Sequence, residues 1–249
     1  DWHPVFQNGY ARYWERNAQP GENVFAGETV DLSVEVLSNQ KVKIMLNKIL
    51  SYVYPNICGF CNKIISTEYT CKNCQEKLKY MYESEKQLVS VNKYFDFLIC
   101  AYKYKGIIRS KILQYKFKNK KYLYASLSER LIKLLDMYSN EIDIIVPVPI
   151  HFMRAFNRGY NQSFLIAKFI AKKMNKELKN NILKKVQNNK PQSMLTASKR
   201  KNNVCNAYKI IKTSAINGKT ILLIDDIYTT GATVNECSKV LKENGARKI

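Results

Sequence analysis

Short apolar runs alternate with longer amphipathic stretches along most of the chain. Two runs, Ile142–Val148 and Thr220–Ile224, are almost wholly apolar and rich in β-branched residues, which is typical of buried parallel strands. Helical spacing of apolar residues follows each run, at about Ser163–Met174 and at Thr233–Asn244, and Gly245 stands where a helix-ending glycine is expected. Strands that alternate with helices predict an α/β fold with a mostly parallel sheet.

The pattern predicts further elements on both sides of the first strand. Helical spacing marks Lys43–Tyr54, Gly106 to about Lys118, and Lys121–Tyr138, whereas Phe97–Tyr104 is dense in aromatic and apolar residues and predicts a strand. The segment Asn188–Asn203 is polar, rich in lysine and without a period, so we expect a long mobile loop there.

Composition divides the chain into three parts. Residues 1–40 hold both tryptophans, no lysine, and two arginines against six acidic residues, so we treat them as an atypical segment of unknown role. Weak alternation at Glu28–Val36 allows a strand. Residues 41–85 form a predicted cysteine module and residues 90–249 the α/β domain. The chain closes on Arg247–Ile249, where a further strand is expected to begin, so we expect the last strand of this domain to be missing.

The formal net charge is +21. Such an excess favours partners such as nucleic acid or phosphorylated ligands, but lysine used as the default surface residue explains it equally well. No apolar stretch approaches the roughly 18 residues of a membrane span, and no signal peptide is visible, so we expect a cytoplasmic protein without membrane insertion.

Four of the seven cysteines form two CxxC pairs with nine residues between them. Doubled pairs of this kind present four thiolates to one tetrahedral zinc ion, and four cysteine ligands leave no open position, which makes such a site structural. A pair of redox dithiols is the competing interpretation, and the symmetric spacing favours zinc. The predicted ligands are Cys58, Cys61, Cys71 and Cys74.

The second apolar run leads into two carboxylates and then into a helix start. Asp225 and Asp226 follow the strand directly, at the sheet edge where open α/β folds bind ligands. A helix N-terminus favours a phosphate group, and a glycine lets the backbone approach it. The carboxylates would repel phosphate, so we expect them to face the hydroxyls of a sugar. The predicted phosphate loop is Thr229, Thr230, Gly231, Ala232 and Thr233.

A polar segment, HFMRAFNRGYNQS, follows the first apolar run and is predicted to be a loop at the same edge of the sheet. Its two arginines, Arg154 and Arg158, could hold a pyrophosphate group through paired hydrogen bonds. An exposed basic turn before the next helix is the alternative, and the residues alone leave both open.

These segments together resemble a known family. ILLIDDIYTTGAT resembles the phosphoribosyl pyrophosphate motif of type I phosphoribosyltransferases. The four-cysteine module, the Tyr102–Arg109 segment, PVP with RGYNQ, and Gln192–Leu195 with Arg200–Asn203 resemble the order of motifs in ComF-like (competence protein F) proteins. The resemblance implies a type I phosphoribosyltransferase fold with an N-terminal zinc module. It also implies binding of phosphoribosyl pyrophosphate with Mg²⁺, and a role in DNA uptake and natural transformation beside other DNA-uptake proteins.

Two functional hypotheses remain open. In the first, the protein is a transferase, and an unidentified acceptor displaces pyrophosphate from the ribose. Asp225 and Asp226 orient the ribose. Arg154 and Arg158 hold the pyrophosphate. In the second, the protein is a non-catalytic adaptor that binds single-stranded DNA and uses the fold as a scaffold or nucleotide sensor. Aromatic residues interleaved with lysines at Tyr102–Tyr124 could stack on bases, although a helix that buries its aromatic face explains them better.

Overall fold

The computed structural model describes residues 2–7, 10–16, 55–66, 68–83, 87–88, 93–187 and 204–249 of the chain. The chain divides into two compact units, Asp1–Ile49 and Leu50–Ile249. In the first unit, β1 (Trp2–Gln7) and β2 (Tyr10–Arg16) form an antiparallel hairpin with an irregularity at Val5 and Phe6, which the sequence pattern did not predict. The expected helix at Lys43–Tyr54, the strand at Glu28–Val36 and the loop at Asn188–Asn203 lie outside the described residues.

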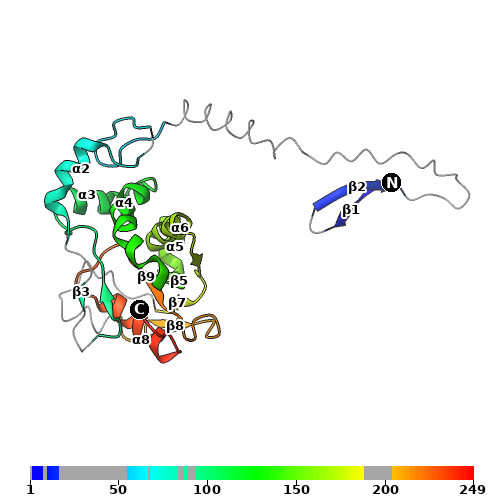
Figure 1. Ribbon diagram of the computed structural model, residues 1–249. Coiled ribbons are helices and arrows are strands. Elements are labelled where there is room, and N and C mark those ends of the chain that lie inside the picture. Colours follow the sequence, from blue (N-terminus) through cyan, green and yellow to red (C-terminus); the bar gives the residue numbers. More distant parts are fainter. Residues whose placement is uncertain are drawn as a thin grey trace, which may run out of the picture. The chain divides into compact units, whose positions relative to one another are not determined.

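A parallel sheet forms the centre of the second unit (Figure 1). The strand β5 (Ile144–Pro147) lies between β6 (Glu177–Leu178) and β9 (Ile221–Ile224), and it runs parallel to both. Beyond β9, Thr220 and Lys248 form an isolated parallel bridge, so the sheet continues at the place where the sequence pattern placed the start of another strand. The predicted α/β class with a parallel sheet is confirmed.

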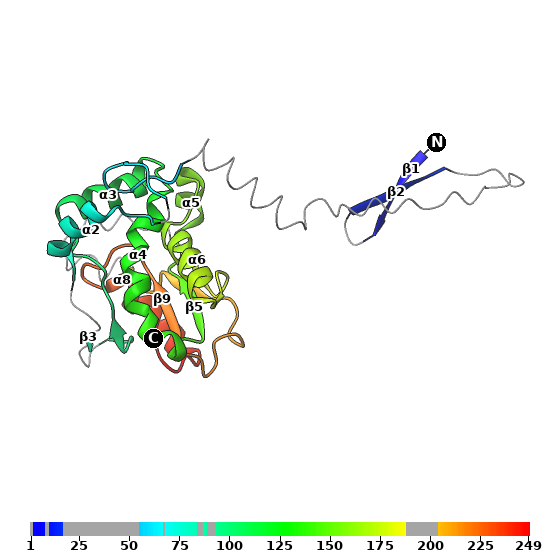
Figure 2. The same cartoon turned by 45° about the horizontal axis from the view of Figure 1, so that its top comes forward.

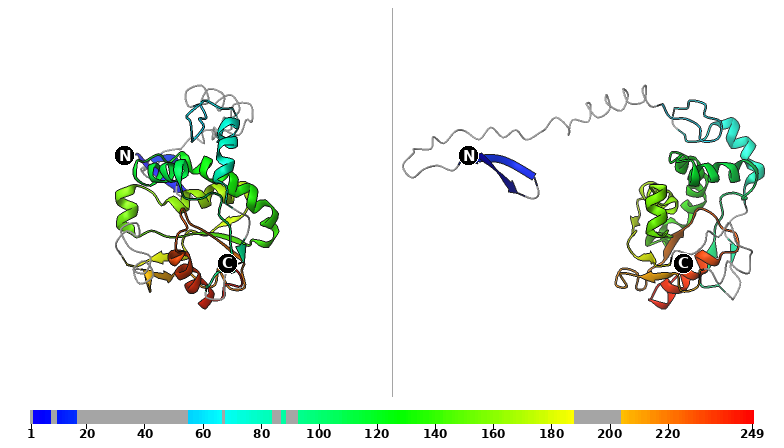
Figure 3. Two further views of the ribbon diagram at one scale, coloured as in Figure 1. Left: turned by 90° about the vertical axis from the view of Figure 1, so that its left-hand side faces the viewer. Right: turned by 180° about the vertical axis from the view of Figure 1, so that it is seen from behind.

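Successive side chains of the central strands point to opposite faces of the sheet, and each face is covered. Ile145 and Ile224 belong to a core on one face, where three helices pack, and Ile144 and Ile221 belong to a second core with Leu241 on the other face. Figure 3 shows the helices of the first core and α8 on either side of the sheet. The covering helices are α3 (Gly106–Phe117), α4 (Leu123–Leu135) and α6 (Gln162–Met174) on the first face, and α8 (Ala232–Glu243) on the second.

Helix boundaries follow the predicted pattern closely. A 3-10 helix, η3 (Asp136–Glu141), continues α4 over the end of the predicted 121–138 stretch. Gly245, one residue past the cap of α8, has φ +96°, so the predicted helix-ending glycine is confirmed. None of the described helices is both apolar enough and long enough for a membrane crossing.

Two sequence predictions are wrong in part. The segment after β5 is not only a loop, because Phe152–Arg158 forms the helix α5. At the start of this helix the Met153 amide donates a hydrogen bond to His151 Nδ1 (3.4 Å). The helix ends at Gly159, which has φ +76°. Only Phe97–Leu98 (β4) of the predicted 97–104 strand is a strand, paired with β3 (Gln87–Leu88). A second antiparallel pair, β7 (Leu183–Lys185) with β8 (Tyr208–Ile210), was not predicted.

The cysteine module packs on the helical side of the unit, next to α3 (Figure 2). Ile57 and Ile64 form an antiparallel bridge around the first CxxC turn, and the second CxxC opens α2 (Lys72–Leu78), which continues as η2 (Lys79–Met81). The side chains of Cys58, Phe60, Cys74 and Leu78 share the core of α3, α4 and α6. The module is therefore built into the same hydrophobic core as the α/β domain.

Candidate functional site

The acid pair lies at the carboxyl end of β9, as predicted. Asp225 Oδ1 accepts hydrogen bonds from the Ser163 hydroxyl (3.0 Å) and from the Asp226 amide (2.9 Å). Asp226 Oδ2 forms an ion pair with Lys116 Nζ at 2.9 Å, and the side chains of Asp226 and Lys116 are only 9% and 21% exposed. Both carboxylates are thus held by residues from other elements, α6 and α3.

The environment of Asp225 favours its neutral form. Burial, together with the adjacent Asp226 carboxylate, raises the pKa of Asp225 to about 7, against the opposing effects of Lys116, the Asp226 amide and Ser163. A carboxyl whose protonation changes near neutral pH makes this site able to accept hydrogen bonds from hydroxyls and to respond to pH.

The loop from Tyr228 to α8 has the geometry of an anion site. Gly231 has φ +71°, and a Cβ there would lie 2.7 Å from the Tyr228 ring, so only glycine fits. The helix α8 starts at Ala232, whose amide donates to Thr230 Oγ1 at 3.4 Å. The N-terminus of a three-turn helix therefore opens directly behind two threonine hydroxyls, Thr229 and Thr230, which is an arrangement that favours a phosphate group.

Arg158 closes α5 and lies near the acid pair. Its Nη1 donates to Gln162 Oε1 at 2.6 Å, and its guanidinium lies 5.2 Å from the centre of the Phe117 ring. Burial lowers the pKa of Arg158, and the Asp226 carboxylate acts in the opposite direction. Arg158 is therefore a partly buried cation within electrostatic reach of the acids.

Arg154 lies one turn earlier on α5. Its positive charge contributes to the lowered pKa of Arg158. Lys185, a buried lysine at the end of β7, also has a lowered pKa, of which burial is the largest cause and the charge of Arg154 the second. Lys185 also lies 5.2 Å from the ring centre of Tyr208. The structure thus brings Arg154, Arg158, Asp225 and Asp226 into one neighbourhood, and it adds Lys185 to them.

Sequence reasoning missed several residues of this neighbourhood. Ser163 is the last residue of HFMRAFNRGYNQS, and neither Ser163 nor Lys185 lies in a local pattern that predicts its role. Lys116 gave no signal, because it is one lysine among many in a basic stretch. Its importance follows from its place on α3, where Ile112 and Tyr115 are buried and turn that end of the helix toward β9.

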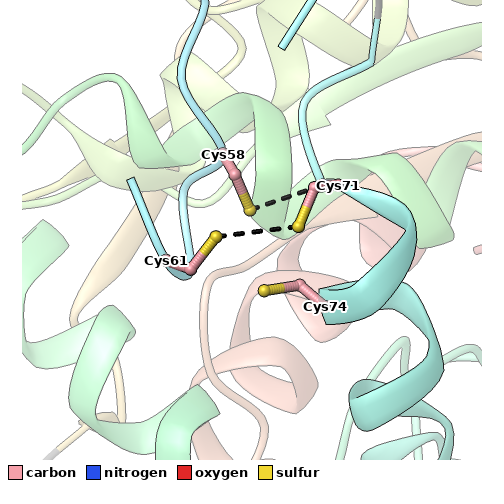
Figure 4. Close-up of side chains that lie close together, drawn as sticks. All are labelled: Cys58, Cys61, Cys71 and Cys74. Atoms are coloured by element: carbon pink, nitrogen blue, oxygen red, sulfur yellow. Dashed lines mark hydrogen bonds between the residues drawn. The ribbon is translucent and has the colours of Figure 1, made fainter. Parts of the chain in front are cut away.

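The four cysteines predicted as metal ligands lie together (Figure 4). Their Sγ atoms all lie within 4.8 Å of one another, and Cys61 Sγ lies 3.6 Å from Cys71 Sγ. A tetrahedral zinc ion with bonds of about 2.3 Å requires sulfur atoms about 3.8 Å apart. The donor set and its spacing therefore fit a closed tetrahedral metal centre.

The thiols of this cluster are electrostatically coupled. Burial acts to raise the pKa of Cys58, but hydrogen bonds from the Cys71, Cys61 and Phe60 amides bring it to about 7. For Cys74, burial and the neighbouring cysteines both raise the pKa far above the usual value for a thiol. A divalent cation would relieve this repulsion between sulfur atoms, so the cluster has the electrostatic character of a metal site.

The cysteine cluster is fastened to α4 at one close contact. The Gly59 amide donates to Ser126 Oγ (3.2 Å), and this hydroxyl donates to the Tyr69 carbonyl (2.6 Å). A Cβ on Gly59 would lie 2.3 Å from Ser126 Oγ, so a larger residue would push the module off the helix. The cluster and the acid pair are separate sites on one framework.

A cavity of about 530 Å³ borders the acid pair and extends along β9. Its walls are mainly apolar, so it is unsuited to hold the charged groups of a phosphorylated ligand. The cavity is lined in part by Cys100, Tyr102, Leu222, Ile224, Asp226 and Tyr228.

Comparison with known proteins adds independent information. The family described as phosphoribosyl transferase domain matches residues 121–249. Competence protein F of Haemophilus influenzae is 28% identical over 200 residues, which cover 78% of this chain and 87% of that protein. DNA utilization protein YhgH of Escherichia coli is 26% identical with the same coverage. Competence protein ComFC of Bacillus subtilis is 25% identical over 208 residues, or 83% of this chain and 80% of that protein.

Proposed function

We propose, since this chain belongs to the ComF-like family of proteins with a phosphoribosyl transferase domain, that it binds phosphoribosyl pyrophosphate with Mg²⁺ and acts in DNA uptake. The names of the relatives support the cellular role. The observation that carries the ligand is the acid pair of β9 followed by the glycine-containing loop at the start of α8.

Each part of the ligand has a matching group. The 5-phosphate lies against Thr229–Thr233, where the amides and dipole of α8 favour a dianion. Two carboxylate oxygens, Asp225 Oδ2 and Asp226 Oδ1, accept no hydrogen bond from any described residue. In this proposal they accept hydrogen bonds from two ribose hydroxyls. Arg154 and Arg158 hold the pyrophosphate group through charge-assisted hydrogen bonds.

Transfer would follow from this binding mode. An acceptor attacks C1 of the ribose, the C1–oxygen bond to pyrophosphate breaks, and positive charge develops on the sugar ring close to Asp225 and Asp226. Arg154 and Arg158 stabilise the leaving pyrophosphate. Bound Mg²⁺ supplies further neutralisation of the pyrophosphate charge, and carboxylate oxygens with ligand phosphates are the donors that this ion prefers.

We also propose that Cys58, Cys61, Cys71 and Cys74 hold structural zinc. The sulfur spacing supports a tetrahedral ion, and four protein ligands leave no position for a substrate. Zinc would fix the two CxxC turns, so that Phe60 and Leu78 stay packed beneath α3 and α4.

Calorimetric titration of phosphoribosyl pyrophosphate with Mg²⁺ tests the ligand assignment. Wild type should bind, and Asp226→Asn should bind at least about tenfold more weakly, because a charge-assisted hydrogen bond is worth roughly 1.5–3 kcal/mol. Asp136→Asn, on the exposed start of η3, is the matched control and should bind like wild type. Equal affinity of wild type and Asp226→Asn, or absence of binding in wild type, would refute the site.

A second function, binding of single-stranded DNA, is favoured by one surface. We call this the α3–α5 surface: it joins the exposed rings of Phe117 and Phe156 with nearby cations. Arg158 lies over the Phe117 ring, and Lys121 lies 5.2 Å from the Tyr160 ring centre. Rings with interleaved cations suit stacked bases and a phosphate backbone. Most of the Tyr102–Tyr124 aromatics do not contribute, because Tyr115 is buried and others pack on the core.

A further inference from the structure

Lys116 forms an ion pair inside the site that no motif of the sequence indicated. Within the described part of the chain, it is the cation in direct contact with the acid pair, with Nζ 2.9 Å from Asp226 Oδ2. Exposed ion pairs contribute little to stability because water and salt screen them, but this pair is largely shielded from solvent. The charge of Lys116 also lowers the pKa of Asp225, against the larger effect of burial.

The position of Lys116 is fixed by its neighbour in the chain. Tyr115 is fully buried, and its hydroxyl donates to the Gln162 carbonyl at 2.9 Å. The Tyr160 hydroxyl in turn donates to the Tyr115 carbonyl, and the two rings lie 5.6 Å apart. The end of α3 is therefore fastened to the segment that joins α5 and α6, and Lys116 reaches Asp226 from a rigid support.

One oxygen of each carboxylate is occupied by a neighbouring group, and the other oxygen is available to a ligand. Lys116 occupies one oxygen of Asp226, and Ser163 with the Asp226 amide occupies one oxygen of Asp225. We propose that Lys116 is a positioning residue of the ligand site: it holds the Asp226 carboxylate in one orientation, so that one oxygen of each acid accepts from a ribose hydroxyl. This inference rests on the proposed binding of phosphoribosyl pyrophosphate.

Lys116→Met tests the role, because it keeps an unbranched side chain of nearly the same length and removes the charge. Its affinity for phosphoribosyl pyrophosphate with Mg²⁺ should fall about ten- to hundredfold at pH 7, the range of one charged hydrogen bond. Lys116→Arg should restore most of the affinity. Lys118→Met removes an exposed lysine two residues away and should bind within about threefold of wild type.

A pH series separates this role from a merely structural one. Lys116 lowers the pKa of Asp225, so without the ammonium group Asp225 holds its proton to higher pH. The loss of affinity in Lys116→Met should therefore be largest at pH 6 and smaller at pH 9. An affinity equal to that of wild type, or a loss by the same factor at every pH, would overturn the proposal. Circular dichroism shows whether the variant folds, and Lys116→Gln replaces it if it does not.

A measurement without ligand keeps this proposal independent of the proposed function. In protein labelled with ¹³C at aspartate carboxyls, the signal lost in Asp225→Asn identifies Asp225. Its titration should move to higher pH in Lys116→Met and stay in place in Lys118→Met. If wild type binds no phosphoribosyl pyrophosphate yet this shift appears, the ligand assignment fails while the effect of Lys116 on Asp225 stands. Unchanged titration in Lys116→Met refutes the role of Lys116.

Discussion

The Asp225 carboxyl connects the chemistry of the site to the stability of the fold. Its pKa is about 7 in the folded chain, against about 4 for an exposed aspartate, so the folded state binds more protons between these values. The contribution of this group to stability is therefore fully present below about pH 4 and is lost as the pH rises to about 7. We expect wild type to lose about 2 kcal/mol more than Asp225→Asn between pH 5 and pH 8. Urea denaturation at both pH values measures the difference, and parallel losses would contradict it.

Gly231 is a second residue whose identity the local geometry requires. Its φ of +71° and the closeness of the Tyr228 ring both oppose a side chain. Gly218 is the matched control, since it has φ +69° but open space around its Cβ position. Gly218→Ala should cost about 1–2 kcal/mol through backbone strain alone, and Gly231→Ala a further 1–3 kcal/mol or so through the contact. Equal destabilisation of the two variants in thermal unfolding would show that the contact with Tyr228 adds nothing to the loss of stability.

At the scale of residues, what the sequence could predict depended on distance along the chain. Asp225, Asp226 and the Thr229–Thr233 loop were predictable because one strand, one turn and one helix start place them together. Lys116 and Ser163 reach the acids from other elements, and only the packing of α3 and α6 on the sheet brings them there. A single sequence carries no local pattern for such contacts.

At the scale of elements, two kinds of segment were predictable. β5 and β9 are unbroken apolar runs closed by polar residues or proline, and α3, α6 and α8 are long enough to show a helical spacing of apolar residues. All five lie within a few residues of their predicted bounds. The seven-residue helix α5 is too short to show a helical period. The β7–β8 pair is three residues long on each strand, and its stability comes from antiparallel pairing that composition does not reveal.

The element that connects the two candidate sites is α3. Ile108, Ile112 and Tyr115 share a core with Cys58 and Cys74, and the next residue after Tyr115 pairs with Asp226. Loss of order around the cysteines would therefore loosen the support of Lys116. Packing of the cysteine module is thus expected to matter for ligand affinity as well as for stability.

Removal of metal tests this connection. We expect a zinc chelator to lower the melting temperature of the protein by at least about 10 °C, because several kcal/mol of folding energy depend on the ion and each is worth roughly 2–4 °C. Cys61→Ser should abolish stoichiometric zinc, measured by elemental analysis, and should weaken binding of phosphoribosyl pyrophosphate. Cys205→Ser changes an equally exposed cysteine outside the cluster and should leave both unchanged. A chelated protein with an unaltered melting curve would argue against a structural metal.

At the scale of the whole molecule, the net charge of +21 has two explanations that the fold does not separate. Many lysines are scattered over the exposed positions, as a default surface residue would be. The α3–α5 surface is different. Arg158 lies over the exposed Phe117 ring and within electrostatic reach of Asp226. Lys121 is an exposed cation beside Tyr160. If this surface binds single-stranded DNA, the interaction should be both electrostatic and stacked.

These two components have separate signatures. Raising salt from 50 to 200 mM should weaken the binding of a single strand about ten- to hundredfold, since each neutralised phosphate releases counterions. Phe156→Ala should weaken binding about fivefold or more at every salt concentration, because stacking is worth roughly 1–3 kcal/mol per base. Met137→Ala, an equally exposed apolar side chain on η3, is the control. Fluorescence anisotropy with labelled oligonucleotides measures all three. If binding depends on salt but Phe156→Ala has no effect, the net positive charge attracts DNA and the α3–α5 surface is not the binding site. The lysine content would then be explained by lysine as the default surface residue.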